Sequence, residues 1–262
     1  MVGLKMNLPG AQAYLNSLMD LYASWGVDFI KVDDISTPYQ RAEIEGYRRA
    51  IDQCGRHIVL SLSPGATSIS VAEHVSHHAN MWRLLGDLWD QWSQVRSAFD
   101  ILHQWESWIG NGHWPDLDML PLGRLRVNGP PTGPADTNRL THAEQRTLMT
   151  LWCIGRCPLM LGGNLPDNDA FTLGLITNPE VLSVDQHSAN NRQLFLKDGQ
   201  AAWGADVPGS ASKYLALFSI GTDKLTAKGA AWSSPLVTRQ TPGHAVPVDV
   251  DITGARQLYL VV

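Results

Sequence analysis

Residues 27–32 read VDFIKV and run directly into Asp33 and Asp34. A short apolar run between Gly26 and a pair of aspartates is typical of a buried strand. Apolar residues at helical spacing lie on both sides of it: Ala11, Leu15, Leu18, Tyr22 and Trp25 before it, and Ile44, Tyr47 and Ile51 after it. A helix, a strand and a further helix in this order indicate a parallel sheet covered by helices.

The alternation of strand and helix continues along the chain. Further strands are expected at residues 57–63 (HIVLSLS), 80–84, 116–120 and 158–161, and further helices at 70–77, 88–108, 141–154 and 169–176. Thr141 and Glu144 form a capping-box pattern at the start of one of these helices. Strands separated by helices predict the α/β class, in which the sheet is parallel.

The pattern changes beyond about residue 200. Apolar residues there alternate with other residues, as at Val246, Val248, Val250 and Ile252, and the chain ends in residues 257–262 (QLYLVV), which have the character of a strand. We therefore predict two domains. Residues 1–195 form an α/β domain, and residues 196–262 begin an antiparallel β-sandwich domain that we expect to be truncated.

The composition indicates which class of protein this is and which partners are not expected. Apolar residues make up 44% of the chain and charged residues 17%, which predicts a globular protein with a core. The net charge of -5 offers no basic excess for phosphates, so no nucleic-acid partner is expected. The sequence has neither a long apolar run nor a signal-peptide pattern. No membrane partner is expected, and the location stays open, with the bacterial periplasm or secretion as options.

Possible metal ligands are few. The three cysteines, Cys54, Cys153 and Cys157, are too few for a disulfide framework and are expected to be buried thiols. A second group of possible ligands lies on one short segment: Glu73, His74, His77 and His78. That segment lacks the HExxH order and is interpreted as a surface helix. A metal-dependent hydrolase would need ligands at adjacent strand ends, where only His113 is close. We expect no metal and no cofactor.

Charged side chains follow the expected strands at their carboxyl ends, where parallel barrels have their active sites. They are Lys31, Asp33 and Asp34, then Arg83 and Asp87, then Asp116 and Asp118. Paired carboxylates are what glycosidic cleavage requires. Four tryptophans lie near these acids in the sequence and could stack on a sugar: Trp82, Trp89, Trp92 and Trp114. The structural alternatives are a helix cap for Asp34 and an ion pair between Arg83 and Asp87.

Three segments together resemble the signature segments of glycoside hydrolase family 27, the α-galactosidase and α-N-acetylgalactosaminidase family. They are residues 29–33 (FIKVD), 82–87 (WRLLGD) and 112–119 (GHWPDLDM), and the likeness extends over residues 8–190. The resemblance implies a (β/α)₈ TIM barrel and a retaining mechanism, with Asp33 as the nucleophile and Asp87 as the acid/base. It also implies that the substrate is bound by Lys31, Ser63, Arg83, Trp114 and Asp118.

This mechanism sets expectations for the two carboxyls. Lys31 and Arg83 should keep the pKa of Asp33 low, whereas burial should raise the pKa of Asp87. Retention requires the carboxyls to stand about 5–5.5 Å apart. The implied substrate is an oligosaccharide or polysaccharide with terminal α-linked galactose. Residues 63–67 (SPGAT) are small and leave room near C2, so an α-N-acetylgalactosaminidase activity remains an alternative. The related β-L-arabinopyranosidase activity is a further alternative.

The count of five strand–helix units falls short of the eight in the family's barrel. We therefore expect the C-terminal part of a barrel, about five βα units without the first three strands, with two unpaired edges. Such a chain is expected to be inactive or prone to aggregate unless a missing N-terminal segment of the same protein joins it. The alternative is a non-catalytic remnant with partial sugar binding. Residues 249–262 resemble the opening of a carbohydrate-binding sandwich module, or belong to an ordinary sandwich domain.

Overall fold

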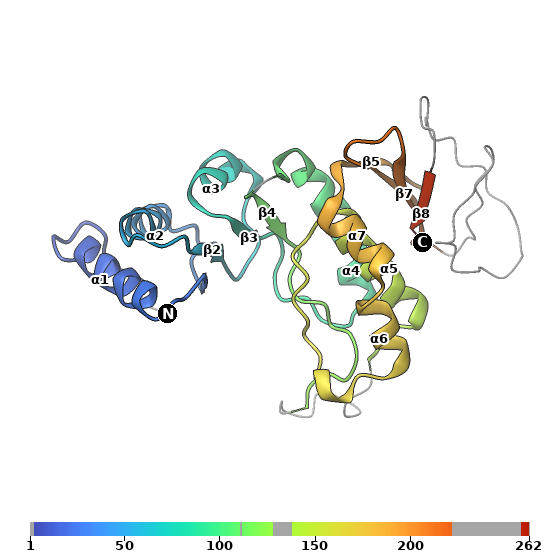
Figure 1. Cartoon of the computed structure of the whole chain (residues 1–262), viewed down its shortest axis with the longest axis horizontal. Helices are drawn as coiled ribbons and strands as arrows, with labels where there is room; N and C mark the ends of the chain where they lie inside the picture. The colour runs from blue at the N-terminus through green and yellow to red at the C-terminus, as the bar shows by residue number, and fades with distance from the viewer. Residues whose placement is uncertain (1–2, 111, 128–137, 222–257, 262) are drawn as a thin grey trace, which may run out of the picture. The chain divides into compact units, whose positions relative to one another are not determined.

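The computed structural model describes residues 3–110, 112–127, 138–221 and 258–261 (Figure 1). The chain divides into two compact units. The first comprises Met1–Asp87 and Trp108–Asp118, and the second comprises Leu88–Ser107 and Met119–Val262.

The first unit is built on a parallel sheet in the order β1-β2-β3-β4. Its strands are β1 (Phe29–Val32), β2 (Val59–Leu62), β3 (Met81–Arg83) and β4 (Trp114–Asp116). Its helices are α1 (Ala11–Ser24), α2 (Arg41–Gln53), the 3₁₀ turn η1 (Ile69–Val71) and α3 (Ala72–His78). Every neighbouring strand pair is parallel, so the predicted α/β class is confirmed.

Helices α1 and α2 pack against each other, side by side in Figure 1. A Cβ atom at Gly46 of α2 would lie 2.5 Å from Cε of Met6 and 2.8 Å from Cδ1 of Leu15. The missing side chain therefore allows α1 to approach α2 closely. Ile44 and Leu15 are both fully buried where these helices meet the core of the first unit.

The register of the sheet decides which side chains share a face. Lys31, Ser61, Met81 and Trp114 form one row across the four strands. Successive residues of a strand point to opposite faces, so the residues two positions further on lie on the same face as this row. Those residues are Asp33, Ser63, Arg83 and Asp116, and Arg83 is paired with Asp116 in the register.

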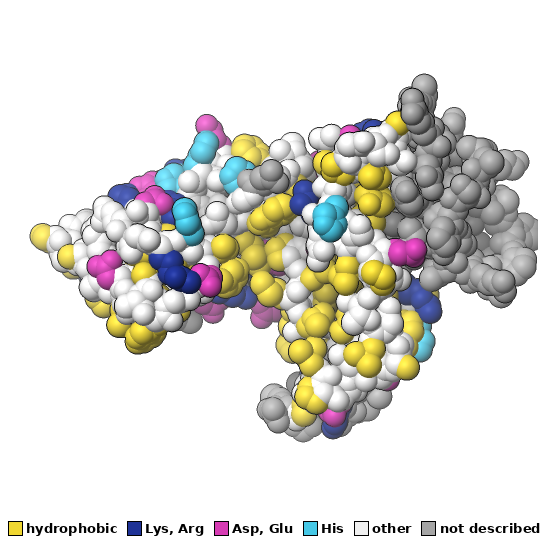
Figure 2. All heavy atoms as spheres, viewed as in Figure 1, with side chains coloured by type: hydrophobic (Ala, Val, Ile, Leu, Met, Phe, Trp, Pro, Cys, Tyr) yellow, Lys and Arg dark blue, Asp and Glu magenta, His cyan; other side chains and the backbone are white. Residues whose placement is uncertain are grey.

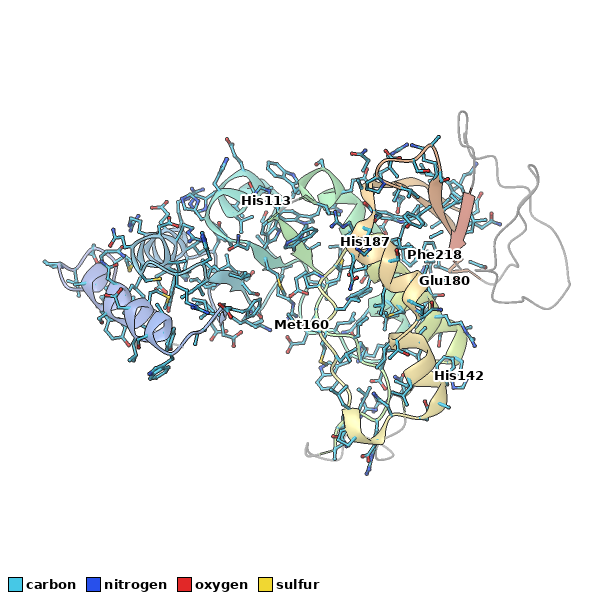
Figure 3. All side chains as sticks on the ribbon, viewed as in Figure 1. His113, His142, Met160, Glu180, His187 and Phe218 are labelled. Carbon is cyan, nitrogen blue, oxygen red and sulfur yellow. The ribbon has the colours of Figure 1, made fainter. Side chains whose placement is uncertain are left out.

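The second unit joins helices to an antiparallel sheet. Its elements are α4 (Trp92–Trp105), η2 (Glu106–Trp108, which ends in the first unit), α5 (His142–Ile154), η3 (Leu165–Asp167), α6 (Ala170–Ile176), α7 (Pro179–His187), β5 (Ala189–Lys197), β6 (Gln200–Asp206), β7 (Lys213–Ser219) and β8 (Leu258–Val261). The ring of Phe218 of β7, labelled in Figure 3, meets that of Phe99 of α4 edge to face, and the ring centroids are 4.9 Å apart. His142 at the start of α5 stacks on Phe171 of α6 at 3.7 Å. These aromatic contacts connect α4 to the sheet and α5 to α6.

Most expected elements are found, and the differences have local causes. The capping box of Thr141 and Glu144 is confirmed at the start of α5. Residues 158–161 do not form the expected strand, since only Leu161 makes a parallel bridge, to Leu120. Pro158 has no N–H to donate to a sheet ladder, and Met160 and Leu161 are 43% and 40% exposed.

Strands β6 and β7 match the predicted antiparallel pattern, and β5, which begins before residue 196, pairs with β6 in antiparallel. β8 confirms a strand at the end of the chain, but it pairs with β7 in parallel. The expected alternation at residues 246–252, and residues 249–257 of the sandwich resemblance, lie outside the described residues. Helix α7 and strand β5 were not among the expected elements. Within the described part of the chain, no helix has the length and apolar character needed to span a bilayer.

Candidate active site

The candidate active site lies at the carboxyl edge of the parallel sheet, within the first unit. Asp33 follows β1 directly, Ser63 follows β2, and Arg83 and Asp116 are the last residues of β3 and β4. The ladder continues past the strand ends, because the backbone N–H of Ser63 donates to the carbonyl of Val32 at 2.9 Å. Backbone pairing thus brings residues from four separate segments to one edge.

Arg83 is the centre of an ion-pair cluster at this edge. Its side chain is only 2% exposed, and Nη1 lies 2.8 Å from Oδ1 of Asp118. Nη1 also donates to Oγ of Ser63 at 3.4 Å, and Nη2 donates to Oδ1 of Asp87 at 3.3 Å. A buried guanidinium requires such partners, because a charge without compensation costs several kcal/mol. Arg83 therefore joins three of the predicted site residues, Ser63, Asp87 and Asp118.

Asp116 is an additional buried carboxyl in this cluster. Its Oδ1 accepts the backbone N–H of Asp118 at 2.7 Å, and this turn holds Asp118 at a φ of 76°. Burial raises the pKa of Asp116 to about 6. The hydrogen bond from Asp118 and the charges of Arg83 and Lys31 lower the pKa, whereas the charge of Asp118 raises it.

Asp116 is expected at the rim from its sequence position, but that position alone gives it no role. The signal that could have identified it is its spacing of two from Asp118, with Arg83 on the neighbouring strand. A carboxyl in that position faces a cation across the sheet. Strand register was needed to see this, because it pairs Arg83 with Asp116 directly.

The β1 end of the site is exposed. The side chains of Lys31 and Asp33 are both exposed, and β1 pairs with β2 alone in the described part of the chain. None of the hydrogen bonds and ion pairs among the described residues involves Asp33. The expected proximity of Arg83 to Asp33 is not found as an ion pair, because Arg83 contacts Asp118 and Asp87 instead.

Two further expectations for the acids at the rim are corrected. Asp87 pairs with Arg83, which is the structural alternative given for these two residues, and its side chain is 71% exposed, so the burial expected of the acid/base is not observed. Asp34 does not cap the next helix: the N-cap of α2 is Gln40, and Asp34 has a φ of 54°. The backbone turns between them, where Ser36 bridges to Tyr39.

The aromatic and thiol side chains divide between surface and core. Trp82 is fully buried, so its indole cannot stack on a sugar, whereas Trp114 is half-buried in the row that contains Lys31. Trp89 and Trp92 belong to the second unit. All three cysteines are free thiols. Cys153 and Cys157 are buried as expected, and Cys54 is only half-buried.

Comparisons with known proteins agree on one family. The family model described as "Alpha galactosidase A" matches residues 3–187. An α-galactosidase of Oryza sativa subsp. japonica is 30% identical over 205 residues, which cover 76% of this chain and 46% of the relative. An α-N-acetylgalactosaminidase of Rattus norvegicus is 30% identical over 178 residues, covering 63% of this chain and 39% of the relative. The chain thus spans about half the length of the curated relatives it matches.

A solved structure is more similar in sequence. The β-L-arabinopyranosidase of Geobacillus stearothermophilus, described as a family 27 enzyme, is 46% identical with a TM-score of 0.80. The match covers 84% of this chain and 52% of that enzyme. A variant of that enzyme has been solved in complex with arabinose.

Proposed function

This chain belongs to the α-galactosidase family, glycoside hydrolase family 27, and from that premise we propose that its first unit provides the chemistry of a retaining glycosidase. Asp33 is the nucleophile and Asp87 the acid/base of this proposal. The substrate is an oligosaccharide or polysaccharide with a terminal α-linked galactose.

The observation that supports the proposal best is the shared face at the carboxyl edge. Asp33, Ser63, Arg83 and Asp116 lie there at the ends of four parallel strands. Active sites of parallel α/β proteins lie at this edge. A nucleophile must reach substrate, and the exposure of Asp33 and its lack of a described partner leave its carboxylate open for attack.

The reaction uses each carboxyl twice. The carboxylate of Asp33 attacks C1 of the sugar while the bond from C1 to the leaving oxygen breaks, and protonated Asp87 gives its proton to that oxygen. Water then attacks C1 of the glycosyl ester on Asp33 and transfers a proton to Asp87, which releases the sugar and restores both groups. Two inversions at C1 give net retention of configuration.

The Arg83 cluster serves binding in this proposal. Arg83 is fixed by Asp118, Ser63 and Asp87, and its Nε is buried without a hydrogen-bond partner among the described residues. Because the Arg83 side chain is only 2% exposed, it serves this proposal by holding Asp87, whose 71% exposed carboxyl is open to the substrate, at small entropic cost. Lys31 and Trp114 lie in the next row of the same face and complete the proposed contacts.

A β-L-arabinopyranoside is the second candidate substrate. The similarity to the Geobacillus stearothermophilus enzyme, at 46% identity, favours it. A β-L-arabinopyranoside has the ring configuration of an α-D-galactoside but lacks the hydroxymethyl group at C5. Both sugars therefore present the same C1 to Asp33, and the choice between them depends on the room around that group.

Hydrolysis of two aryl glycosides tests the proposal. Joined by the N-terminal segment that is expected to complete the barrel, the chain should cleave an aryl α-D-galactopyranoside or the matched β-L-arabinopyranoside, and the ratio of kcat/KM identifies the preferred sugar. Proton NMR of the first product should show the anomeric configuration of the substrate. Inversion would contradict the roles of Asp33 and Asp87. Absence of hydrolysis, with galactose binding still seen by calorimetry, would favour the non-catalytic sugar-binding alternative.

A further inference from the structure

A second group of polar side chains lies on the helices of the first unit. Glu45 on α2 and His74 and His78 on α3 each offer one ligand atom, and these three atoms lie within 4.8 Å of one another. Figure 2 shows histidine side chains gathered over α2 and α3. From these groups we propose a divalent metal site for a cation of the Zn²⁺ type, with Glu45, His74 and His78 as its protein ligands.

The spacing of the ligands suits a metal ion. His74 and His78 are one helical turn apart, so both imidazoles project from the same face of α3. Their rings stack with centroids 4.1 Å apart and planes inclined by 21°. Glu45 joins them from the neighbouring helix, with Oε1 3.1 Å from Nε2 of His74. Two imidazoles and a carboxylate are ligands that Zn²⁺ accepts in proteins, with water in the remaining position.

The second nitrogen of each imidazole already has a partner. Nδ1 of His78 lies 2.7 Å from the carbonyl oxygen of His74, to which it can only donate. That bond places the proton on Nδ1 and leaves Nε2 of His78 with a free lone pair. Metal-binding histidines in proteins are held in this way by a backbone carbonyl or carboxylate.

His74 is held by Tyr39. The hydroxyl of Tyr39 lies 2.6 Å from Nδ1 of His74. A hydroxyl can donate or accept, so it can accept a hydrogen bond from the Nδ1–H of His74 when Nε2 binds a metal. The side chain of His74 is only 9% exposed, which protects this arrangement from water. Without metal the same atoms form a chain from Tyr39 through His74 to Glu45.

Two arginines near the cluster would oppose a bound cation. Arg49 lies 3.6 Å from Oε2 of Glu45, which leaves Oε1 facing His74. Arg41 is a second positive charge near the cluster, and its charge acts on both Tyr39 and His74. Both arginine side chains are exposed, so water screens their repulsion of a bound cation.

A metal here would have a structural role. Tyr39 belongs to the segment that leads from Asp33 to α2, and the ligands lie on α2 and α3. A bound ion would therefore link two helices with the loop that follows the proposed nucleophile. The site shares no residue with the proposed catalytic machinery, so its test does not depend on hydrolysis.

Binding of Zn²⁺ alone to the full chain tests the site, measured by calorimetry and equilibrium dialysis in a metal-free buffer. His78→Gln and Glu45→Gln should each weaken one saturable site by more than about tenfold, and Tyr39→Phe should weaken it by about tenfold. The matched control is His77→Gln, an exposed histidine on the same helix, which should bind as the unaltered chain does. Zn²⁺ should also raise the Tm of the unaltered chain and of the control.

The outcomes are distinct. Absence of Zn²⁺ binding to the unaltered chain would overturn the proposal. It would also be overturned if Glu45→Gln and His78→Gln bound Zn²⁺ as tightly as the unaltered chain does. Should His78→Gln fail to fold, the isosteric Glu45→Gln decides alone, because its amide keeps the hydrogen bond from His74 and loses only the charge. Co²⁺ bound at the same site should give the visible absorption of a low-coordinate ion, and loss of that absorption in Glu45→Gln would confirm the ligand.

Discussion

The two ends of the site edge differ in how firmly their charged groups are held. At the β3–β4 end, Arg83, Asp116 and Asp118 are buried and bonded to one another. At the β1 end, Lys31 and Asp33 are exposed, and Asp33 has no hydrogen-bond partner among the described residues. Strand register brings both ends to one edge, but only burial and ion pairing fix the side chains. The buried groups at the β3–β4 end should therefore contribute to stability, whereas the exposed carboxyls of Asp33 and Asp87 should contribute to chemistry.

Asp33→Asn should have the largest effect, and only on activity. Loss of the nucleophile should lower the rate of glycoside hydrolysis by about 10⁴-fold or more. The free energy of unfolding should change by less than about 0.5 kcal/mol relative to the unaltered chain, because the side chain is exposed. Kinetics on an aryl glycoside and urea denaturation measure the two effects. The neighbouring variant Asp34→Asn is the control and should keep most of the activity, and a comparable loss there would remove the distinction between the two aspartates.

Arg83→Ala should cost the most stability. It leaves the buried carboxyls of Asp116 and Asp118 without their cation, at a cost of about 3–5 kcal/mol. Urea denaturation measures the change. Arg96→Ala, on the exposed face of α4, is the control. Its free energy of unfolding should differ from that of the unaltered chain by less than about 0.5 kcal/mol. Equal stability of the two variants would show that the cluster at the β3–β4 end is not what holds that end together.

Asp116→Asn should change how stability depends on pH. The pKa of Asp116 is raised from 3.8 to about 6 in the folded chain. Between these pH values the folded state binds more protons than the unfolded state. The contribution of Asp116 to stability is therefore fully present below the unfolded pKa. It is lost as pH rises through about 6, a change of about 3 kcal/mol. Denaturation from about pH 4 to about pH 7 should show a flatter profile for the variant. Identical profiles would mean that Asp116 is not the titrating group.

Asp87→Asn should have only a small effect on stability. Its carboxylate is 71% exposed, so its ion pair with Arg83 contributes less than about 1 kcal/mol. Asp118→Asn, which removes the shorter and more buried pair, should cost several times more in the same denaturation series. Hydrolysis by Asp87→Asn should nevertheless fall by about 10²–10⁴-fold, as expected for a lost acid/base. A stability loss equal to that of Asp118→Asn would contradict the contrast between an open and a buried partner.

Local patterns predicted most of the elements. The apolar run of residues 27–32 placed β1, and the Thr141 and Glu144 pattern placed the start of α5, because strands and caps depend on neighbouring residues. Pro158 was overlooked in an apolar segment, where its missing N–H prevents a full ladder. Helix α7, which follows the cap Asn178, was missed because its apolar face is short.

The sequence predicts where the site residues lie along the sheet edge, but not how buried each side chain is. Strand ends located Asp33, Arg83, Asp87 and Asp118, since carboxyl ends of parallel strands meet at one edge. Burial depends on neighbours that are distant in sequence, so the exposure of Asp87 and the raised pKa of Asp116 could not be read from spacing.

The histidine cluster shows the same limit. Its sequence members included Glu73 and His77, whereas the fold selects Glu45 from another helix. Helical spacing correctly related His74 to His78, because that relation is local. The third ligand depends on how α2 packs beside α3, which no pattern within one segment records.

The most direct test of the account is to trap the proposed covalent intermediate. A 2-deoxy-2-fluoro-glycosyl fluoride of galactose configuration should react once with the chain, losing fluoride as a carboxylate forms an ester at C1. Peptide mapping by mass spectrometry should then place the added sugar on Asp33, and Asp33→Asn should acquire none. A sugar found on Asp87, Asp116 or another carboxyl, or labelling that persists in Asp33→Asn, would contradict Asp33 as the nucleophile.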